Sequence, residues 1–369
     1  MNNARPIGVY IHVPFCGAKC PYCDFYSLPG SAATMDAYVS KVCETIEASP
    51  NVPADTLYFG GGTPSLLGVD RLARCIAAAK RRFLLQGAEI TVEANPNAPP
   101  AFFRDLAQTG TNRVSLGMQS IHPAELQALG RRHTAAQVRE AIRLLREGGI
   151  TNLSLDLMLA IPHQTKDSLR ESIAFCAEEN IPHISAYLLK IEPGTEFFCH
   201  KDALAPLLPS DDETADRYLF AVEELAKHGY LQYEISNFCR EGQISRHNCK
   251  YWQGEEYLGI GPSAHSYLAG KRFYFPQNLR GFLDGAVPMD DGEGGSREEF
   301  AMLALRLCTG LTQTLWQERF GEPLPAVYLQ RAKKFAASGL VRWSPEGFSF
   351  TPKGFLVSNA LLAEILGES

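Results

Sequence analysis

Residues 10–26 read YIHVPFCGAKCPYCDFY, a stretch that holds three cysteines within eight residues. Cys16, Cys20 and Cys23 have CxxxCxxC spacing, and two prolines disfavour a helix there. A structural zinc site usually has four protein ligands, yet no second CxxC pair or HxxxH follows. Three thiolates on one loop instead favour an open-sided metal site, because three cysteines can bind three irons of a 4Fe-4S cube.

Composition limits the class of protein. The 369 residues are 45% hydrophobic and 21% charged, as in an ordinary globular chain of one large domain with smaller additions. The net charge of −6 argues against a nucleic-acid partner, which would require a basic face. We expect a cytoplasmic protein, because we find neither a signal peptide nor a membrane-spanning segment, and the other cysteines show no disulfide spacing.

Short β-rich segments alternate with helical periodicity over the first half of the chain. Strands are predicted at residues 7–13, 56–59, 89–93, 113–116, 152–157 and 183–188. Helices are predicted between them at residues 35–48, 69–83, 135–146 and 166–179. Such βα units imply a parallel sheet, either a partial barrel or a doubly wound sheet.

Polar and glycine residues follow the predicted strands at their carboxyl ends. The cysteine loop follows the first strand, and the other strand ends carry Gly60 to Gly62, Glu93, Gln119, Asp156 and Lys190. In a barrel of βα units, functional groups gather at this end. The sequence therefore favours an α/β fold with a partial (β/α)6 barrel.

The CxxxCxYC loop after a strand-like segment resembles the signature of radical S-adenosylmethionine (SAM) enzymes. The resemblance implies a 4Fe-4S cluster on Cys16, Cys20 and Cys23, with its free iron binding the methionine moiety of SAM. The GGGTP sequence is similar to the SAM-binding motif of the coproporphyrinogen-oxidase-like branch. Further matches to that branch imply these SAM contacts: Tyr10, Tyr22, Gly61, Gly62, Thr63, Glu93, Gln119, Arg131, Asp156, Lys190 and His265.

Residues 247–252 read HNCKYW, which combines a histidine, a cysteine and two aromatic residues. An isolated histidine is usually an ordinary buried residue, but here aromatic surfaces that could pack on a macrocycle lie beside it. HNxxYW resembles the hallmark of the HemW family of haem chaperones. The resemblance implies that His247 binds haem, and Cys249 is a chemical alternative.

Three domains are expected. The radical SAM partial barrel covers residues 1–200, an extension with HNxxYW and the GIGPSAHS element covers 201–290, and a C-terminal winged-helix-like α+β domain covers 291–369. Residues 285–296, GAVPMDDGEGGS, are predicted to be a linker. Mixed charges in the C-terminal domain favour packing or partner docking over DNA binding.

The resemblance implies three cofactors, namely a 4Fe-4S cluster, SAM and haem. It also implies that the chain delivers haem to respiratory proteins. Recipients at the membrane and a homodimer are both compatible with this function. Whether SAM is cleaved stays open, and no catalytic residue is assigned. The alternative is an oxygen-independent coproporphyrinogen III oxidase. Against it, Phe25 stands where that enzyme has a fourth cysteine, and only fifteen residues precede Cys16. A DNA-binding sensor is a third hypothesis, which the acidic charge disfavours.

Overall fold

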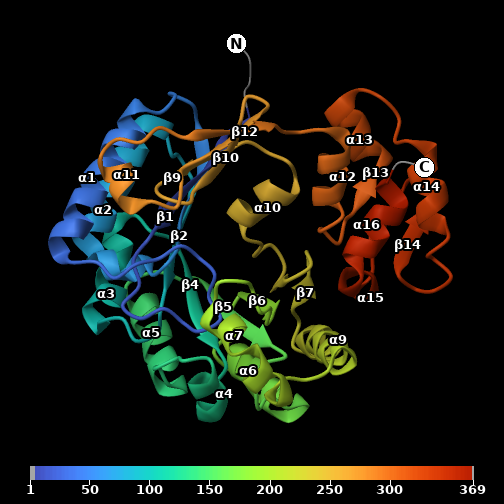
Figure 1. The fold of residues 1–369 in the computed structure, drawn as a ribbon, viewed down its shortest axis with the longest axis horizontal. Helices are drawn as coiled ribbons and strands as arrows, with labels where there is room; N and C mark the ends of the chain where they lie inside the picture. The colour runs from blue at the N-terminus through green and yellow to red at the C-terminus, as the bar shows by residue number, and fades with distance from the viewer. Residues whose placement is uncertain (1–4, 368–369) are drawn as a thin grey trace.

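A curved sheet built from strand–helix units forms the centre of the computed structural model, which describes residues 5–367 (Figure 1). Its six central strands are β1 (Ile7–Val13), β2 (Ala54–Gly61), β3 (Glu89–Ala94), β4 (Arg113–Gln119), β5 (Asn152–Leu159) and β6 (His183–Leu188). The connecting helices are α1 (Ala32–Ala48), α2 (Gly68–Phe83), α3 (Pro100–Asp105), α4 (Pro123–Ala128), α5 (Ala135–Glu147) and α6 (Lys166–Glu178). This alternation confirms the predicted α/β class.

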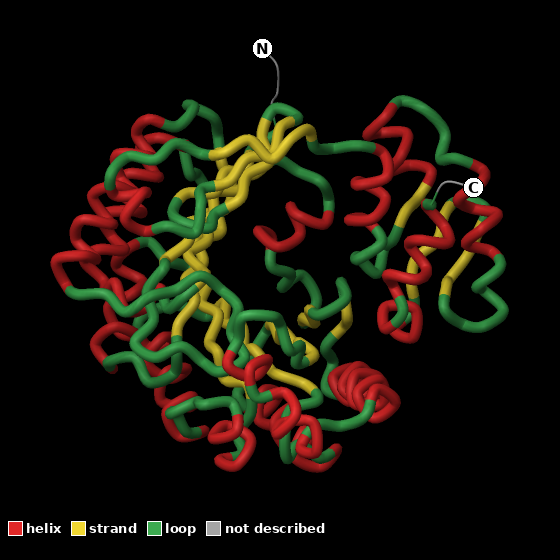
Figure 2. The backbone as a smooth tube through the Cα atoms, in the orientation of Figure 1, coloured by secondary structure: helices red, strands yellow, loops and turns green. Residues whose placement is uncertain are grey.

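The six central strands are parallel and neighbour one another in chain order. They are buried almost throughout, because helices cover the convex face and the concave face encloses the interior (Figure 2). Strands β1 and β6 are not paired with each other, so the barrel stays open. The predicted partial barrel is therefore confirmed.

The sheet extends beyond the predicted barrel on both sides. The added strands are β7 (Leu231–Gln232), β8 (Asn237–Cys239), β9 (Tyr257–Ile260), β10 (His265–Leu268), β11 (Lys271–Tyr274) and β12 (Met289–Glu293). The order is β12-β11-β10-β9-β1-β2-β3-β4-β5-β6-β8-β7, with β9 parallel to β1. The predicted linker at 285–296 is thus wrong in part, because β12 lies within it and pairs with β11.

Further helices connect these strands. They are α7 (Glu196–Cys199), α8 (Lys201–Leu204), α9 (Asp211–Lys227), α10 (Arg246–Trp252) and α11 (Leu279–Leu283). Helix α9 begins at a capping box, in which Ser210 and Glu213 bond each other's backbone amides. Helix α10 differs from the outer helices because it lies on the concave side of the sheet, where it contacts β2 (Figure 1).

The C-terminal residues form a small unit of helices and strands beside the open side of the sheet (Figure 1). It contains α12 (Arg297–Ala304), β13 (Leu311–Thr312), α13 (Gln313–Phe320), α14 (Ala326–Lys333), β14 (Val341–Ser344), β15 (Gly347–Phe350), α15 (Pro352–Leu356) and α16 (Ser358–Leu366). The three strands form an antiparallel sheet, and Trp316 is fully buried against Phe320. The α+β class predicted for the C-terminal part of the chain is therefore confirmed.

Between residues 5 and 367, no helix is both long and apolar enough to cross a bilayer.

Candidate cofactor site

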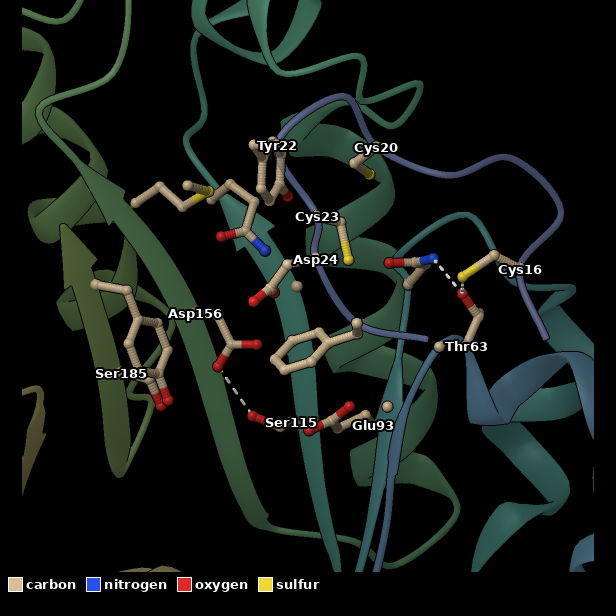
Figure 3. Close-up of a pocket in the computed structure, with 18 of the residues that line it drawn as sticks. Cys16, Cys20, Tyr22, Cys23, Asp24, Thr63, Glu93, Ser115, Asp156 and Ser185 are labelled. Carbon is tan, nitrogen blue, oxygen red and sulfur yellow. Dashed lines mark hydrogen bonds between the residues drawn. The ribbon is translucent and has the colours of Figure 1, made fainter. Parts of the chain in front are cut away.

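A cavity of about 570 Å³ opens at the carboxyl ends of the central strands (Figure 3). The cysteine loop forms one side, and the ends of β2 to β6 supply the others. The predicted residues that line it are Cys16, Cys20, Tyr22, Cys23, Gly61, Gly62, Thr63, Glu93, Gln119, Arg131, Asp156 and Lys190. These predicted residues therefore lie together at one cavity, and their contacts with SAM stay predictions.

The cysteine loop is held over this cavity by a cation and an aromatic hydroxyl. Arg131 donates to the Tyr22 hydroxyl from Nε at 3.0 Å and from Nη2 at 2.7 Å. Its third contact is Nη1 to the Asn95 Oδ1 at 2.8 Å. Because Tyr22 lies between Cys20 and Cys23 in the chain, this bidentate contact fixes the middle of the loop.

The chemistry of the three cysteines fits a cluster bound from one side. All three are free and half-buried, and Figure 3 shows their sulfur atoms facing the space that the loop encloses. In a 4Fe-4S cluster each cysteine binds a different iron, so three cysteines on one loop suit a cluster that is held from one side.

The glycine run after β2 is needed for close packing. A Cβ at Gly62 would lie 2.6 Å from the Phe15 carbonyl oxygen, and one at Gly61 would lie 2.5 Å from the His12 ring. Gly61 also has φ +101°, a conformation that favours glycine. The run lets β2 pass directly beneath the cysteine loop, with Thr63 Oγ1 at 3.3 Å from Cys16 Sγ. Gly61 and Gly62 also line the cavity.

Two of the acidic residues that line the cavity, Glu93 and Asp156, lie on the central strands. Burial raises the pKa of Glu93 to about 7 and that of Asp156 to about 6. Glu93 accepts a hydrogen bond from the Tyr58 hydroxyl at 2.7 Å, and Asp156 accepts one from Ser115 at 3.0 Å (Figure 3). Because each carboxylate is poorly solvated, a cationic ligand would stabilise both charged forms.

Two of the predicted SAM contacts lie outside the cavity lining. The Tyr10 hydroxyl contacts His12 Nδ1 at 3.1 Å, beneath the cavity wall. His265 begins β10, is mostly exposed and stacks on Tyr274, with ring centroids 5.1 Å apart. SAM contact by these two residues stays a prediction.

Sequence reasoning missed several cavity residues. Asn95 bridges Arg131 and Thr63, with its Nδ2 at 3.4 Å from Thr63 Oγ1. Ser115, Tyr187 and Asn248 also line the cavity. Ser115 was detectable, because it alternates along β4 with Gly117 and the predicted Gln119, and all three line the cavity. Asn248 could also have been identified, because it is the second residue of the HNxxYW motif.

His247 lies below the cavity and is almost completely buried. Its Nδ1 contacts Thr56 Oγ1 at 2.8 Å, and its Nε2 contacts the Tyr251 hydroxyl at 2.8 Å. Burial lowers its pKa to about 3, so the imidazole is neutral at physiological pH. Neutral imidazole is the form that binds metals, but both nitrogens are occupied here. Haem ligation by His247 stays a prediction and requires this ring to exchange a partner.

Ionic contacts hold α10 against the amino ends of the strands. The Glu89 carboxylate accepts the backbone amides of Arg246 at 3.2 Å and His247 at 3.1 Å. The buried Lys250 ammonium contacts Asp55 at 2.9 Å and Glu255 at 2.7 Å. Cys249 is also buried, and burial raises its pKa to about 12, so it would not readily form a thiolate.

Comparison with known proteins places this geometry in a family. A "Heme chaperone HemW" of Lactococcus lactis is 33% identical to this chain over 98% of both proteins. The chain belongs to the HemW family. The HemW of Escherichia coli is 32% identical, and the alignment covers 100% of both chains. Residues 10–176 match the Radical SAM superfamily, and residues 297–357 match the HemN C-terminal domain.

The fold of the HemW-family chain is shared with a solved enzyme structure. Coproporphyrinogen III oxidase (HemN) from Escherichia coli, described as a radical SAM enzyme, superposes with a TM-score of 0.83. The alignment covers 98% of this chain and 90% of that one, at 21% sequence identity. At this identity the likeness establishes the fold, including the C-terminal domain.

Proposed function

We propose that this chain binds haem and delivers it to haem-dependent respiratory proteins. The observation that carries the proposal is full-length similarity to HemW haem chaperones, with the HNxxYW motif folded as one helix beside the cofactor cavity. His247 is the proposed iron ligand. Its neutral imidazole suits this role once Tyr251 or Thr56 releases one ring nitrogen.

The cavity is the proposed seat of a 4Fe-4S cluster and SAM. Cys16, Cys20 and Cys23 would hold the cluster, whose reduced form supplies an electron to SAM in this superfamily. Glu93 and Asp156 would face the cationic ligand, while Arg131 holds the loop in place. These roles concern binding and orientation, and they require no SAM cleavage.

We also propose a cytoplasmic location and haem recipients that include membrane-associated proteins. Support for a reducing compartment comes from the cysteines, which are free throughout the described residues. The acidic balance of −6 supports the absence of a nucleic-acid partner.

A haem titration tests the haem proposal. Anaerobically reconstituted wild type, His247→Ala and His228→Ala would be titrated with haem and followed by the Soret band. His228 is a matched control, because it ends α9 on the outside of the molecule. Saturable binding in wild type and His228→Ala that weakens at least roughly tenfold in His247→Ala is expected, since an iron ligand would be lost. Equal binding in all three proteins would overturn His247 as ligand.

Absence of saturable binding in wild type would contradict the chaperone function itself. The same protein would then be assayed with coproporphyrinogen III, SAM and a reductant. Product formation in that assay would favour the oxidase alternative.

A further inference from the structure

Tyr58 lies between the two proposed sites and contacts both of them. It is buried near the end of β2, and it lines the cavity. Its hydroxyl donates to the Glu93 Oε1 at 2.7 Å. Its ring stacks on the His247 imidazole, with centroids 5.1 Å apart and planes inclined by 24°. One rigid side chain therefore touches a cavity carboxylate at one end and the proposed haem ligand along its face.

The adjacent residue of α10 strengthens this connection. Asn248 lines the cavity, whereas His247 lies behind Tyr58 with its ring among Tyr10, Thr56 and Tyr251. A ligand that fills the cavity thus meets α10 at Asn248. Tyr58 and Asn248 together form the wall between the cavity and His247.

We propose that Tyr58 is a positioning residue that links the cavity to His247, so that SAM in the cavity weakens haem binding at His247. This inference rests on the proposed function. A cationic group of SAM near Glu93 would keep that carboxylate ionised, and hydrogen bonds to an ionised acceptor are shorter and stronger than neutral ones. The strengthened bond would fix the Tyr58 ring, and with it the stack that holds His247 in its buried position.

Haem binding requires His247 to leave this buried position. To reach an iron, His247 has to release Thr56 or Tyr251 and move relative to the Tyr58 ring. Any ligand that stabilises the buried arrangement therefore opposes haem. Because linkage is reciprocal, haem at His247 must weaken SAM binding by the same factor.

The test measures haem affinity of anaerobically reconstituted protein with and without saturating SAM, in wild type, Tyr58→Phe and Tyr230→Phe. Tyr58→Phe keeps the stacked ring and removes only the hydroxyl that reaches Glu93. Tyr230→Phe is the matched control, because its buried hydroxyl donates to the Ile181 carbonyl at 2.7 Å, away from both sites. Thermal unfolding of each protein verifies that it is folded.

We expect SAM to weaken haem binding by roughly fivefold or more in wild type and in Tyr230→Phe, and by less than about twofold in Tyr58→Phe. The readout is the ratio of haem affinities with and without SAM within each protein, so a change in the SAM-free affinity of Tyr58→Phe does not affect it. If SAM has no effect in wild type, or strengthens haem binding, the link is refuted while the chaperone function stands. Equal coupling in Tyr58→Phe would refute the role of Tyr58. Loss of haem binding in wild type would instead refute the proposed function.

Discussion

Glu93 and Asp156 show how single residues prepare the cavity for a cationic ligand. Burial disfavours the charged form of both groups, and the nearby Asp156 disfavours that of Glu93 further. Tyr58 and Ser115 supply one hydrogen bond to each carboxyl. Burial of these two groups therefore lowers the stability of the fold, and a cationic ligand in the cavity would offset this cost.

Removing the Glu93 charge should change how stability depends on pH. The folded-state pKa of Glu93 is raised from 4.5 to about 7, so the folded chain binds more protons than the unfolded chain between these values. Stability is therefore lost as pH rises through this window. Relative to wild type, Glu93→Gln should gain about 1–2 kcal/mol of unfolding free energy between roughly pH 5 and pH 8.

Urea unfolding of the cluster-free protein at both pH values measures this difference. Asp70→Asn on the outside of α2 is a matched control for removal of a carboxylate. A Glu93→Gln difference that stays constant with pH would show that Glu93 titrates normally.

The assignment of the three loop cysteines as cluster ligands can be tested by the absorbance of the cluster alone. Each change of Cys16, Cys20 or Cys23 to Ala should abolish the cluster absorbance near roughly 400 nm after anaerobic reconstitution, because three thiolates are the minimum for this site. Cys43→Ala, on the outer helix α1, should retain it. Iron and sulfide analysis supplies the second readout, and full iron content in the loop variants would disprove the ligand assignment.

At the scale of elements, α10 depends on a buried lysine. Lys250 is 6% exposed and contacts two carboxylates and the Pro6 carbonyl. Lys250→Ala should cost about 1–3 kcal/mol of unfolding free energy, because Glu255 and the Pro6 carbonyl lose their partner while Asp55 keeps Arg246. Lys227→Ala, whose side chain is 65% exposed in its pair with Glu224, should cost less than about 1 kcal/mol. Similar losses in the two variants, measured by urea unfolding, would mean that α10 is not anchored through Lys250.

The central strands were predictable and the added strands were not, for a physical reason. Strands buried on both faces carry continuous apolar runs, such as residues 7–13, which are recognisable in sequence. In contrast, β12 has five exposed residues with the sequence MDDGE, and β7 has only two residues. Their pairing comes from neighbouring strands rather than from their own side chains, so composition at 285–296 indicated a linker.

The candidate site likewise has features that could be predicted from sequence and features that could not. Residues at the carboxyl ends of parallel strands converge by topology, so Glu93, Gln119 and Asp156 could be placed together from sequence. The burial of His247 could not be foreseen, because it depends on α10 entering the concave face and on contacts to distant Thr56 and Glu89. Motif spacing identifies a residue, but long-range packing decides its accessibility.

At the scale of the whole molecule, α10 lies between the curved sheet and the C-terminal domain. It contacts β2 on one side and α12 on the other. The Arg306 guanidinium lies over the Trp252 ring at 5.3 Å, and Arg319 donates to the Gly254 carbonyl at 3.1 Å. Motion of the C-terminal domain would therefore reach HNxxYW directly, which would give the proposed receiving protein a route to the proposed haem site.

Delivery of haem tests this account most directly. Protein with haem bound would be mixed anaerobically with the haem-free form of a respiratory haem protein, and the Soret bands and restored activity would be followed. We expect stoichiometric transfer that is faster than transfer from free haem, and a loaded His228→Ala control that behaves like wild type. Retention of haem by this chain, or filling of the acceptor no faster than with free haem, would contradict it.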